Sequence, residues 1–584
     1  MYSIFTNIVL QYKTKELSFM SSCKIASYKE KYIAKNYTPY TTVRIKCPQE
    51  GTDCSEYITK IIESAGDHTI FSFDTGRYLI NSFALVKGKK NIILEGNNSV
   101  FLQHYDSNDY GKNASHIFHI EECKDVIIRN LIVEADSPTQ VSGTVVNVGE
   151  NYLDVKVTDK IPFTGNEHGC IGYSHSSQAY CTHAIARSAS TVEPFYAYIG
   201  GEIPTTNPVP APIECEKIGD DVLRLKNLYN QQNGNPYPEN NTFEVGTPFS
   251  LRYIYYGPAA FVFRNTDNVL VEDVRIFSFG GMGFVILPRC SNFTFNRLEI
   301  SPKEPDIYHY STLADGIHTT GLAGKLIITN SIFRNLGDDT LNAHTQVMKA
   351  KNIGENEIEI YYDKKKPHIS PYWADAGDIL RVYDGKTYER KADVTVRSFD
   401  GNKVIIDTNP NIVEDDFIVN DSYRADILIE NCVSYNMRGR AFITCGAKSM
   451  KVTNCEFHNT DGCALYMTTA FNGWLEGAQV ENVEFCNNYI SGCDLWYDEN
   501  TSVISAKIRT SAIGFEADSS IPALHSNIHI HDNVFENISG RIAGIDYTDG
   551  ITVENNIFAN CNGTKDKIQF NYCKNFAERN NVEL

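Results

Sequence analysis

A short phrase recurs along the chain, and its spacing constrains the fold more than any other feature. In each copy apolar residues alternate with polar ones, an apolar pair follows, and an asparagine closes the unit. Clear copies end at Asn335, Asn436, Asn459, Asn537 and Asn560, with 23 residues between the ends of the second and third and of the last two. A repeat of this length holds two or three short strands. Such a unit buries too little apolar surface to be stable alone, so it must stack on its neighbours.

Stacking of these units predicts an all-β chain folded as a right-handed parallel β-helix. Each strand would pair in parallel with its equivalent on the next coil, about 4.8 Å away. Equivalent inward positions would form columns, which explains the recurrence of Phe333, Phe457, Phe535 and Phe558. We expect the repeated asparagine side chains to bond backbone groups at the bends, where strand hydrogen bonds end. A solenoid also accommodates 584 residues in one continuous body.

Two stretches lack the repeat and read as small β-barrels inserted between coils. The expected order is an N-terminal extension, first coils with a capping helix, an inserted barrel, coils with the chemistry, a second inserted barrel and the last coils: 1–40, 41–140, 141–250, 251–345, 346–420 and 421–584. The apolar spacing from Ser55 to Gly66 predicts the helix that covers the open end of the solenoid. Insertions leave solenoids through their loops, where they often line a binding cleft.

Composition limits the classes of partner. A formal net charge of -19 disfavours nucleic acid and anionic membranes, and no apolar run of about 18 residues occurs. We therefore expect no nucleic acid and no membrane as partner, while a homodimer stays open. The charge also weakly disfavours a polyanionic substrate.

The cysteines and the N-terminus bear on the compartment. Many of the sixteen cysteines lie in strand-like runs, and none forms paired zinc-finger spacing, so we interpret them as buried free thiols in a reducing environment. The N-terminus lacks a basic start followed by an apolar core, so we expect no signal peptide and a cytoplasmic location. An alternative start at Met20, with secretion, stays open.

Three aspartates are the candidate catalytic residues. Asp315 lies 24 residues before Asp339, close to one coil, and Asp338 directly precedes Asp339. Alignment of the residues that follow places Asp315 beside Asp339 on adjacent coils. Repulsion among three neighbouring carboxylates would raise at least one pKa, as a general acid near neutral pH requires. The alternatives are solvated turns and a calcium site, although we expect neither a metal nor another cofactor.

The acidic motifs resemble those of β-helical glycoside hydrolases. They are ADGIH, from Ala314 to His318, and GDDTLNAH, from Gly337 to His344. The closer resemblance is to glycoside hydrolase family 110, the α-1,3-galactosidases, which carry these motifs in this order and interrupt their β-helix with β-barrel inserts. It spans roughly residues 45–580, with weaker matches at GGMGF, MRGRAFIT and FNGWLEG.

The resemblance implies an exo-acting, inverting hydrolase that releases terminal α-1,3-linked galactose from blood-group-B-type or linear glycans. On the matching positions Asp338 corresponds to the general acid, and Asp315 and Asp339 to the pair that holds the water. Inverting glycosidases separate acid and base carboxyls by about 6.5–9.5 Å. A stacked pair of Asp315 and Asp339 therefore fits a shared base role better than an acid and a base on opposite sides of a sugar.

Seven further residues are candidates for contact with the substrate. An arginine one coil beyond Asp339 could bind sugar hydroxyls or only neutralise the acids. The histidines that follow the acids could touch the sugar or be structural, and an indole in a glycine-rich bend could stack on a sugar ring or pack under a loop. The set is His318, His344, Arg438, Arg440, Tyr466, Trp474 and Glu476.

Three other functions stay open at this point. A polygalacturonase-like hydrolase of another galactose- or uronate-containing glycan would share the acids but need a basic cleft, for which Arg438, Arg440, Lys507 and Arg509 are the candidates. A polysaccharide lyase would need calcium and a basic proton acceptor. A non-catalytic glycan-binding β-helix would share the fold alone, and its binding would survive substitution of the acids.

Overall fold

A computed structural model describes most of the chain. Two compact units are distinguished, Met1–Thr42 and Val43–Leu584, and the features below belong to the second. The described residues are 40–105, 114–137, 139–149, 152–157, 182–184, 197–199, 214–226, 245–246, 248–252, 257–303, 310–362, 370–471, 474–493, 502–509, 520–561 and 566–584. Within these ranges, no helix is long and apolar enough to cross a membrane.

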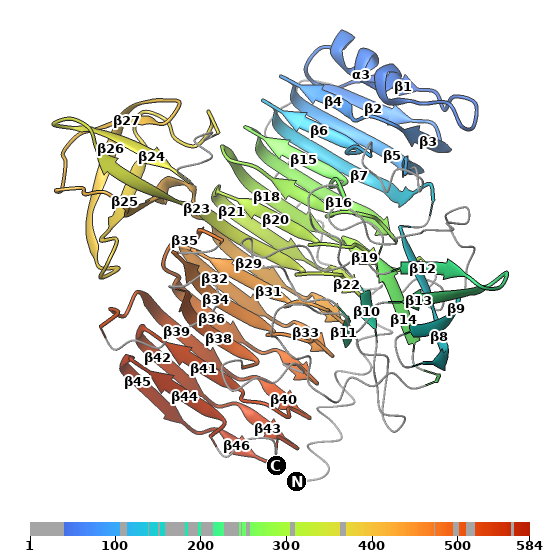
Figure 1. Cartoon of the computed structure of the whole chain (residues 1–584). Coiled ribbons are helices and arrows are strands. Elements are labelled where there is room, and N and C mark those ends of the chain that lie inside the picture. The colour runs from blue at the N-terminus through green and yellow to red at the C-terminus, as the bar shows by residue number, and fades with distance from the viewer. Residues whose placement is uncertain are drawn as a thin grey trace. The chain divides into compact units, whose positions relative to one another are not determined.

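Stacked coils of short parallel strands form the body of the unit, which confirms the predicted parallel β-helix (Figure 1). A central coil consists of β20 (Ile317–Thr320), β21 (Leu322–Thr329) and β22 (Ile332–Arg334), one strand on each of three faces. The next strand, β23 (Leu341–Asn352), returns to the first face and pairs in parallel with β20. Equivalent strands of successive coils therefore lie above one another.

The three faces run through most of the unit. On the first face the strands besides β20 and β23 are β4 (Ala84–Lys87), β6 (Phe118–Glu121), β15 (Phe261–Arg264), β17 (Phe284–Ile286), β31 (Phe442–Cys445), β34 (Leu465–Ala470), β38 (Ile504–Arg509), β41 (Ala543–Asp546) and β44 (Ile568–Asn571). On the second face, with β21, they are β2 (Thr69–Phe73), β5 (Lys90–Gln103), β7 (Lys124–Ala135), β16 (Asp267–Phe277), β18 (Cys290–Asn296), β29 (Asp426–Glu430), β32 (Ser449–Thr453), β36 (Glu481–Cys486), β39 (His525–His531), β42 (Thr548–Glu554) and β45 (Lys574–Arg579). On the third face, with β22 and the ends of β5, β7 and β16, they are β3 (Arg77–Ile80), β19 (Glu299–Ser301), β30 (Val433–Tyr435), β33 (Glu456–His458), β37 (Tyr489–Ser491), β40 (Val534–Glu536), β43 (Ile557–Ala559) and β46 (Val582–Glu583). The strand β1 (Thr41–Ile45) precedes them in the chain.

The recurrent phenylalanines form the predicted inward column on the third face. Phe535 stands opposite Phe558 in the parallel register, and all four are buried in one continuous apolar core: Phe333, Phe457, Phe535 and Phe558. Close packing of these columns provides the apolar burial that a single coil lacks.

The repeated asparagines shape the backbone at the bends. Those that end the sequence phrase all have φ between 51° and 55°, the left-handed region that asparagine tolerates better than other side chains. A second ladder of asparagines bonds the backbone through its side chains. Asn533 Nδ2 donates to Phe485 O at 2.9 Å, and Asn533 Oδ1 accepts from Asn488 N at 3.0 Å. The same pattern continues at Asn556 and Asn581.

The predicted helix at the start of the solenoid is α3 (Ser55–Ser64). Its Ile58 and Ile62 are fully buried in the same core as the first strands. A hydroxyl fixes its position, since Thr59 Oγ1 accepts from Leu85 N at 2.9 Å. The helix thus covers apolar residues of the first coils, where the stack has no further coil to bury them.

The first interruption of the coils carries an antiparallel sheet. Its strands follow the order β11-β10-β14-β8-β9-β13-β12. Their bounds are β8 (Gln140–Val148), β9 (Tyr152–Val157), β10 (Thr182–Ala184), β11 (Ala197–Ile199), β12 (Glu214–Lys217), β13 (Val222–Lys226) and β14 (Pro248–Arg252). The sequence predicts a barrel here, whereas no pairing among the described strands joins the two edges of this sheet.

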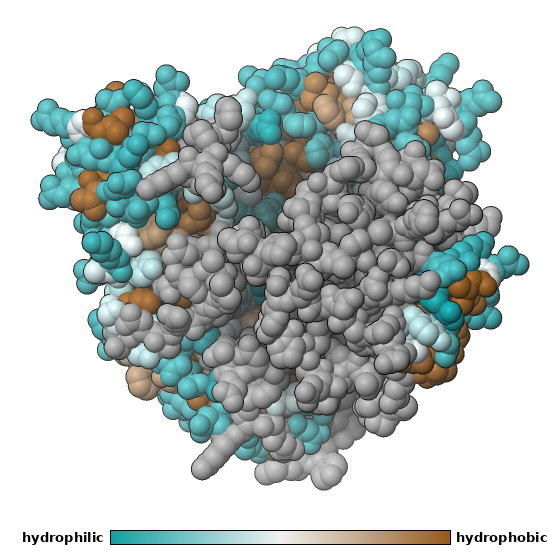
Figure 2. Space-filling view, viewed as in Figure 1, coloured by the Kyte–Doolittle hydropathy of each residue, from teal (hydrophilic) through white to brown (hydrophobic). Residues whose placement is uncertain are grey.

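The second interruption is a closed antiparallel barrel of six strands. Beyond its first-face part, β23 pairs with both β24 and β28, and the ring closes through β27, β26 and β25. The bounds are β24 (Glu357–Tyr361), β25 (Ile379–Tyr383), β26 (Arg390–Asp400), β27 (Lys403–Ile406) and β28 (Asp416–Asn420). Its apolar residues fill the interior, and Figure 2 shows a mainly hydrophilic outer surface with small apolar areas.

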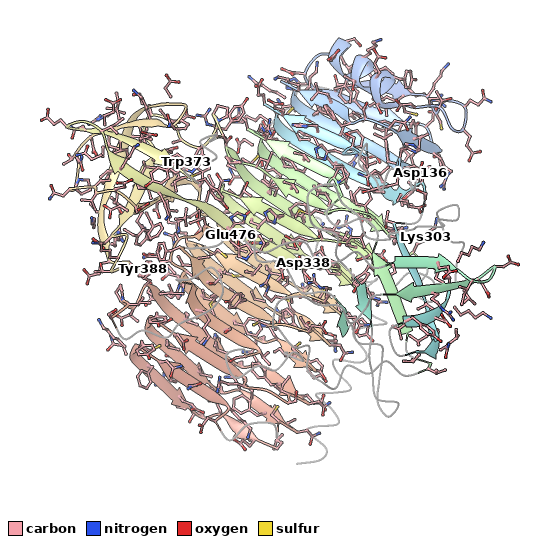
Figure 3. The ribbon with its side chains drawn as sticks, viewed as in Figure 1. Asp136, Lys303, Asp338, Trp373, Tyr388 and Glu476 are labelled. Carbon is pink, nitrogen blue, oxygen red and sulfur yellow. The ribbon has the colours of Figure 1, made fainter. Side chains whose placement is uncertain are left out.

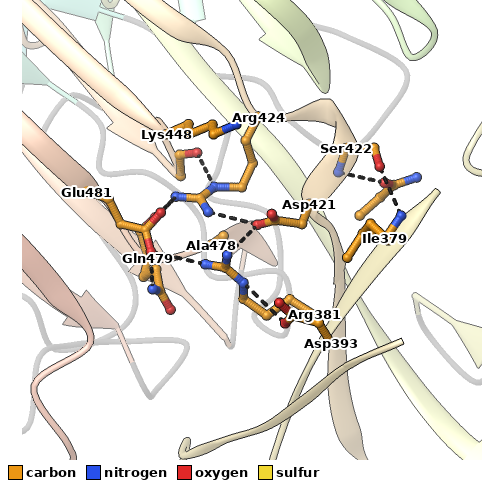
Figure 4. A network of polar contacts seen from close by, with 12 residues as sticks. Ile379, Arg381, Asp393, Asp421, Ser422, Arg424, Lys448, Ala478, Gln479 and Glu481 are labelled. Atoms are coloured by element: carbon orange, nitrogen blue, oxygen red, sulfur yellow. Dashed lines mark hydrogen bonds and ion pairs between the residues drawn. The ribbon is translucent and has the colours of Figure 1, made fainter. Parts of the chain in front are cut away.

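Two buried arginines attach this barrel to the coils (Figure 4). Arg424, just after the short helix η1 (Asp421–Tyr423), donates to Asp421 at 2.7 Å and to Glu481 at 2.9 Å. Arg381 of β25 lies 3.0 Å from the same aspartate and 3.3 Å from the same glutamate. Because Glu481 begins the coil strand β36 of the second face, these contacts hold the barrel against the coils at the start of that face.

Candidate active site

The three candidate aspartates meet in turns that lead into the first face. Asp315 precedes β20, and Asp338 and Asp339 precede β23. These turns stack because Gly316 N donates to Asp339 O at 2.9 Å. One oxygen of each aspartate lies within 4.8 Å of an oxygen of each of the others. Figure 3 shows Asp338 at the middle coils. The structure thus brings together the residues that the coil spacing groups.

Asp339 is a buried carboxylate held by one arginine. Arg440 donates to its Oδ1 from the backbone N and from Nε, both at 2.8 Å, and to its Oδ2 from Nη2 at 2.7 Å. Burial opposes the arginine's charge, but the charge and hydrogen bonds of Asp339 raise the pKa of Arg440 well above its usual value. The predicted column of Asp339 and Arg440 is therefore a bidentate pair with defined geometry.

Asp315 lies in a different environment, without an arginine of its own. Its Oδ1 accepts from Asp339 N at 3.3 Å, and its Oδ2 lies 2.7 Å from His318 Nδ1. Burial and the neighbouring charge of Asp339 raise the pKa of Asp315 well above the usual aspartate value, against the charge of Arg440. The expectation of one raised pKa within the trio thus falls on Asp315.

Asp338 is the most accessible of the three. Its side chain is 17% exposed, compared with 5% for Asp315 and 2% for Asp339. Arg438 Nη1 lies 3.8 Å from its Oδ2 and donates to Gly337 O at 2.7 Å. Asp338 is therefore the carboxyl that a substrate reaches most directly.

Two histidines and a glutamate extend the cluster along the first face. His318 and His344 approach each other through their Nε2 atoms at 3.1 Å, with the rings edge to face. His344 Nδ1 lies 3.2 Å from Thr345 O, and its Nε2 lies 3.8 Å from Glu476 Oε1. Burial lowers the pKa of both histidines against the charge of Glu476. Glu476 arrives through β35 (Glu476–Gly477), which pairs with β23.

The remaining two candidates for substrate contact, Tyr466 and Trp474, lie in different places. Tyr466 lies under Arg440, whose guanidinium carbon is 5.7 Å from its ring centroid. Trp474 is 52% exposed, and its described contact is through its backbone oxygen, which accepts from Tyr362 Oη at 2.7 Å. The structure thus joins Tyr466 to the aspartates and places Trp474 where its ring faces solvent, beside the barrel.

Comparisons with known proteins identify relatives of the chain. No protein-family model matches the chain. It is 24% identical to alpha-1,3-galactosidase A of Shewanella woodyi, over 80% of this chain and 73% of that protein. It is 22% identical to alpha-1,3-galactosidase B of Bacteroides thetaiotaomicron, over 87% and 82%. The chain is a homologue of the α-1,3-galactosidases. By this relationship it is a glycoside hydrolase, which confirms the family resemblance that the sequence indicated.

A further relative matches only part of the chain, and solved structures are less similar. Alpha-1,3-galactosidase A of Akkermansia muciniphila is 26% identical over 54% of the chain, which spans about half (52%) of that relative's length. Among solved structures, the exopolygalacturonase of Thermotoga maritima is 13% identical with 96% of each chain covered, at a TM-score of 0.42. The polygalacturonase of Erwinia carotovora ssp. carotovora is 10% identical, covering 94% of this chain and 96% of the other, at 0.38. These scores are too low to carry an argument about activity.

Two residues at the site of this α-1,3-galactosidase homologue were not predicted from the sequence. An ideal Cβ on Gly439 would lie 2.8 Å from Asp339 Oδ1, so only glycine lets the next coil approach the acids. Cys445 stands opposite His344 in the parallel register, with its Sγ 3.9 Å from Glu476 Oε2. Counting one coil onward from His344, the signal used for Arg440, would have found Cys445.

The aspartates also meet the distance criterion for a cation site, and their hydrogen bonds bear on it. Asp339 uses both oxygens on Arg440, and Asp315 uses its two oxygens on Asp339 N and His318. Calcium takes six to eight oxygen ligands. The trio therefore offers few uncommitted oxygens, and the expectation of a metal-free mechanism stays a prediction.

Proposed function

We propose that this glycoside hydrolase is an exo-acting, inverting α-galactosidase that releases terminal α-1,3-linked galactose. The observation that carries the proposal is the trio of Asp315, Asp338 and Asp339, stacked in register and unequal in accessibility, in a chain whose relatives are named alpha-1,3-galactosidases. Clustered carboxyls in different environments are what acid-base cleavage of a glycosidic bond requires.

The environments support a division of roles. Asp338, the accessible carboxyl, is the general acid that protonates the leaving oxygen. Asp315 and Asp339 hold the water that attacks the anomeric carbon, and Asp315 takes its proton. A covalent nucleophile would need an uncommitted carboxylate, whereas Asp339 has both oxygens on Arg440. This argument favours attack by water, and hence inversion.

The spacing of the acids makes the stereochemistry the decisive measurement. Oxygens within 4.8 Å of one another are closer than the separation of about 6.5–9.5 Å between the carboxyls of typical inverting glycosidases. With Asp338 as acid, the water would lie beside Asp315 and Asp339 rather than across the sugar from a distant base. The anomer released first tests this arrangement directly.

Paired charges support a neutral sugar over a uronate. Of the basic candidates for a polygalacturonase-like cleft, Arg440 binds Asp339 and Lys507 Nζ lies 2.6 Å from Asp546 Oδ2. Arg438 donates to Gly337 O and lies near Asp338, while the side chain of Arg509 is outside the described residues. A uronate would need a cation not already neutralised, so a galactoside fits this site better.

The wider context is part of the same proposal. We infer a reducing, cytoplasmic setting, because the twelve cysteines whose side chains are described form no disulfide and ten of them are buried. The partner is a carbohydrate with a terminal α-galactose, and a homodimer is a further prediction that sedimentation would test.

Hydrolysis of α-1,3-linked galactobiose, followed by proton NMR, tests the function. The wild type should release β-galactose first, and Asp338→Asn should lose about 10²–10⁴-fold in kcat because the general acid is gone. Asp400→Asn, an exposed carboxylate on β26 of the barrel, is the matched control and should retain activity. Initial release of α-galactose would contradict inversion. Turnover of a galacturonan instead would replace the proposal with the polygalacturonase-like one.

A further inference from the structure

A continuous chain of polar contacts leads from Asp315 to a carboxylate at the other side of the histidine pair. Asp315 Oδ2 lies 2.7 Å from His318 Nδ1, and the two Nε2 atoms of His318 and His344 are 3.1 Å apart. His344 then lies 3.2 Å from Thr345 O through Nδ1 and 3.8 Å from Glu476 through Nε2. The path runs from the turn before β20 through β20 and β23 to β35, strands that pair in this order.

The contact with the Thr345 carbonyl determines where the hydrogens lie. A carbonyl oxygen only accepts, so His344 Nδ1 must carry a hydrogen to make that bond. In a neutral ring its Nε2 is then an acceptor, and it accepts from His318 Nε2–H. Burial lowers the pKa of His318, which favours a neutral ring. In that ring Nδ1 has a lone pair and accepts a hydrogen from a protonated Asp315.

The opposite assignment leaves a repulsive contact. With Asp315 ionised and both rings neutral, His318 Nδ1–H donates to Asp315 and His344 Nε2–H donates to His318. His344 Nδ1 would then point a lone pair at Thr345 O, 3.2 Å away. The His344 side chain is 7% exposed and that of His318 16%, so water cannot relieve this contact at low cost. The protonated-Asp315 arrangement satisfies every group in the path.

We propose that Asp315, His318, His344 and Glu476 form a proton relay, in which His344 takes up a proton when Asp315 acts as the base on water. The relay rests on the function proposed above and explains how a carboxyl that is protonated at rest can serve as a base. His318 and His344 are positioning residues, because they act through Asp315.

The proton transfers balance along the path. The Asp315 proton moves to His318 Nδ1 while the His318 Nε2 proton moves to His344 Nε2, which leaves an Asp315 carboxylate and a His344 imidazolium. The imidazolium forms beside Glu476. When water attacks, its proton goes to Asp315 and its oxygen to the anomeric carbon, as Asp338 gives its proton to the leaving oxygen. Asp315 then passes the proton taken from water to Asp338 through solvent, and the two transfers along the path reverse, which restores the starting state.

Charges around the path are arranged in favour of the transfer. Glu476 attracts the proton on His344, and its charge also opposes ionisation of Asp315. The ionisable groups that face the path from the adjoining turns and strands are Asp338, Asp339, Arg440, Cys445 and Glu476. Among these the described cation, Arg440, is committed to Asp339, which leaves His344 as the site opposite Glu476 for a transferred proton.

Neutron diffraction of the deuterated wild-type protein tests the resting state without any substrate. We expect deuterons on Asp315, on His318 Nε2 and on His344 Nδ1. A deuteron on His318 Nδ1 with none on Asp315 overturns the relay. This result does not depend on which sugar the enzyme cleaves, so it separates failure of the relay from failure of the proposed function.

The pH profile of kcat tests the transfer itself. In His344→Gln, Asp315 must lose its proton to solvent. The low-pH limb should therefore move to higher pH by about one unit or more, which lowers kcat about tenfold on that limb. At higher pH kcat should recover. Glu476→Gln should move it in the same direction by less. His458→Gln, on the third face, is the control and should leave the profile unchanged. A uniform loss of kcat at every pH in His344→Gln would indicate packing alone and overturn the relay.

Discussion

Arg440 binds both carboxylate oxygens of Asp339 from the neighbouring coil, although 101 residues and an entire barrel separate the two in the sequence. Because the barrel leaves the first face through β23 and the chain returns before β29, the coil resumes in register. Gly439 permits the close approach that the pair needs. The geometry of the acids therefore depends on the solenoid closing correctly around its insert.

Arg440→Met should lower kcat by about 100-fold, because Asp339 would lose the groups that orient it. Removing the arginine also leaves a buried carboxylate unpaired. Since the arginine side chain is 36% exposed and partly screened, we expect a loss of only about 1–2 kcal/mol in the free energy of unfolding. Urea unfolding and steady-state kinetics measure the two effects. In the double variant Arg440→Met, Asp339→Asn no buried charge is unpaired, so stability should recover while activity stays low. If stability does not recover, the pairing argument is wrong.

Asp315→Asn should increase stability at neutral pH. The folded pKa of Asp315 is raised by burial and by Asp339, so between the unfolded value of about 3.9 and the folded pKa the native state binds more protons. Stability from this group is therefore present below about pH 4 and is lost as the pH rises through the folded pKa. Unfolding at pH 5 and pH 8 should show a smaller decline in the variant. The exposed control Glu389→Gln should show the same decline in the free energy of unfolding as the wild type. If Asp315→Asn also shows that decline, the pKa of Asp315 is not raised.

The spacing of the repeat predicted the coils because each coil obeys local rules. Alternating apolar residues, Phe333 and its equivalents, and asparagines that accept a positive φ recur wherever a coil does. The alignment of Gly316 with Thr340 likewise predicted the register in which Ile317 faces Leu341, and with it the meeting of Asp315 and Asp339. Registers that follow from one repeat length are accessible to a sequence argument.

Features set by side-chain direction were not accessible. The sequence did not indicate that the raised pKa would fall on Asp315, because this depends on which aspartate Arg440 reaches. The contact of His344 with Thr345 O, which orients the histidine path, depends on a ring rotation that no spacing encodes. The roles predicted for the three aspartates and for the seven binding candidates stay predictions.

Asn533→Ala should destabilise the solenoid by about 2–4 kcal/mol. Its amide donates to Phe485 O and Asn556 Oδ1 and accepts from Asn488 N and Nδ2, all within the buried core, so the substitution leaves several groups unsatisfied. Thermal and urea unfolding measure the loss. Asn560→Gly provides the contrast, since Asn560 has φ of 52° at an exposed bend and glycine adopts that angle freely. Equal losses at the two sites would contradict the buried role of the ladder.

His525 should stay neutral far below the pH at which an exposed histidine is charged. Full burial lowers its pKa to about 4, while its Nδ1 accepts from Val480 N and its Nε2 donates to Lys507 O, both at 3.1 Å. Between about pH 6.5 and 4 the unfolded chain binds a proton that the folded chain does not, so stability falls as the pH is lowered, by about 3 kcal/mol from this group. Denaturant unfolding at pH 7 and 4.5 should show that His525→Gln loses less than the wild type over this interval. An unchanged interval in His525→Gln would mean that other groups cause the acid instability.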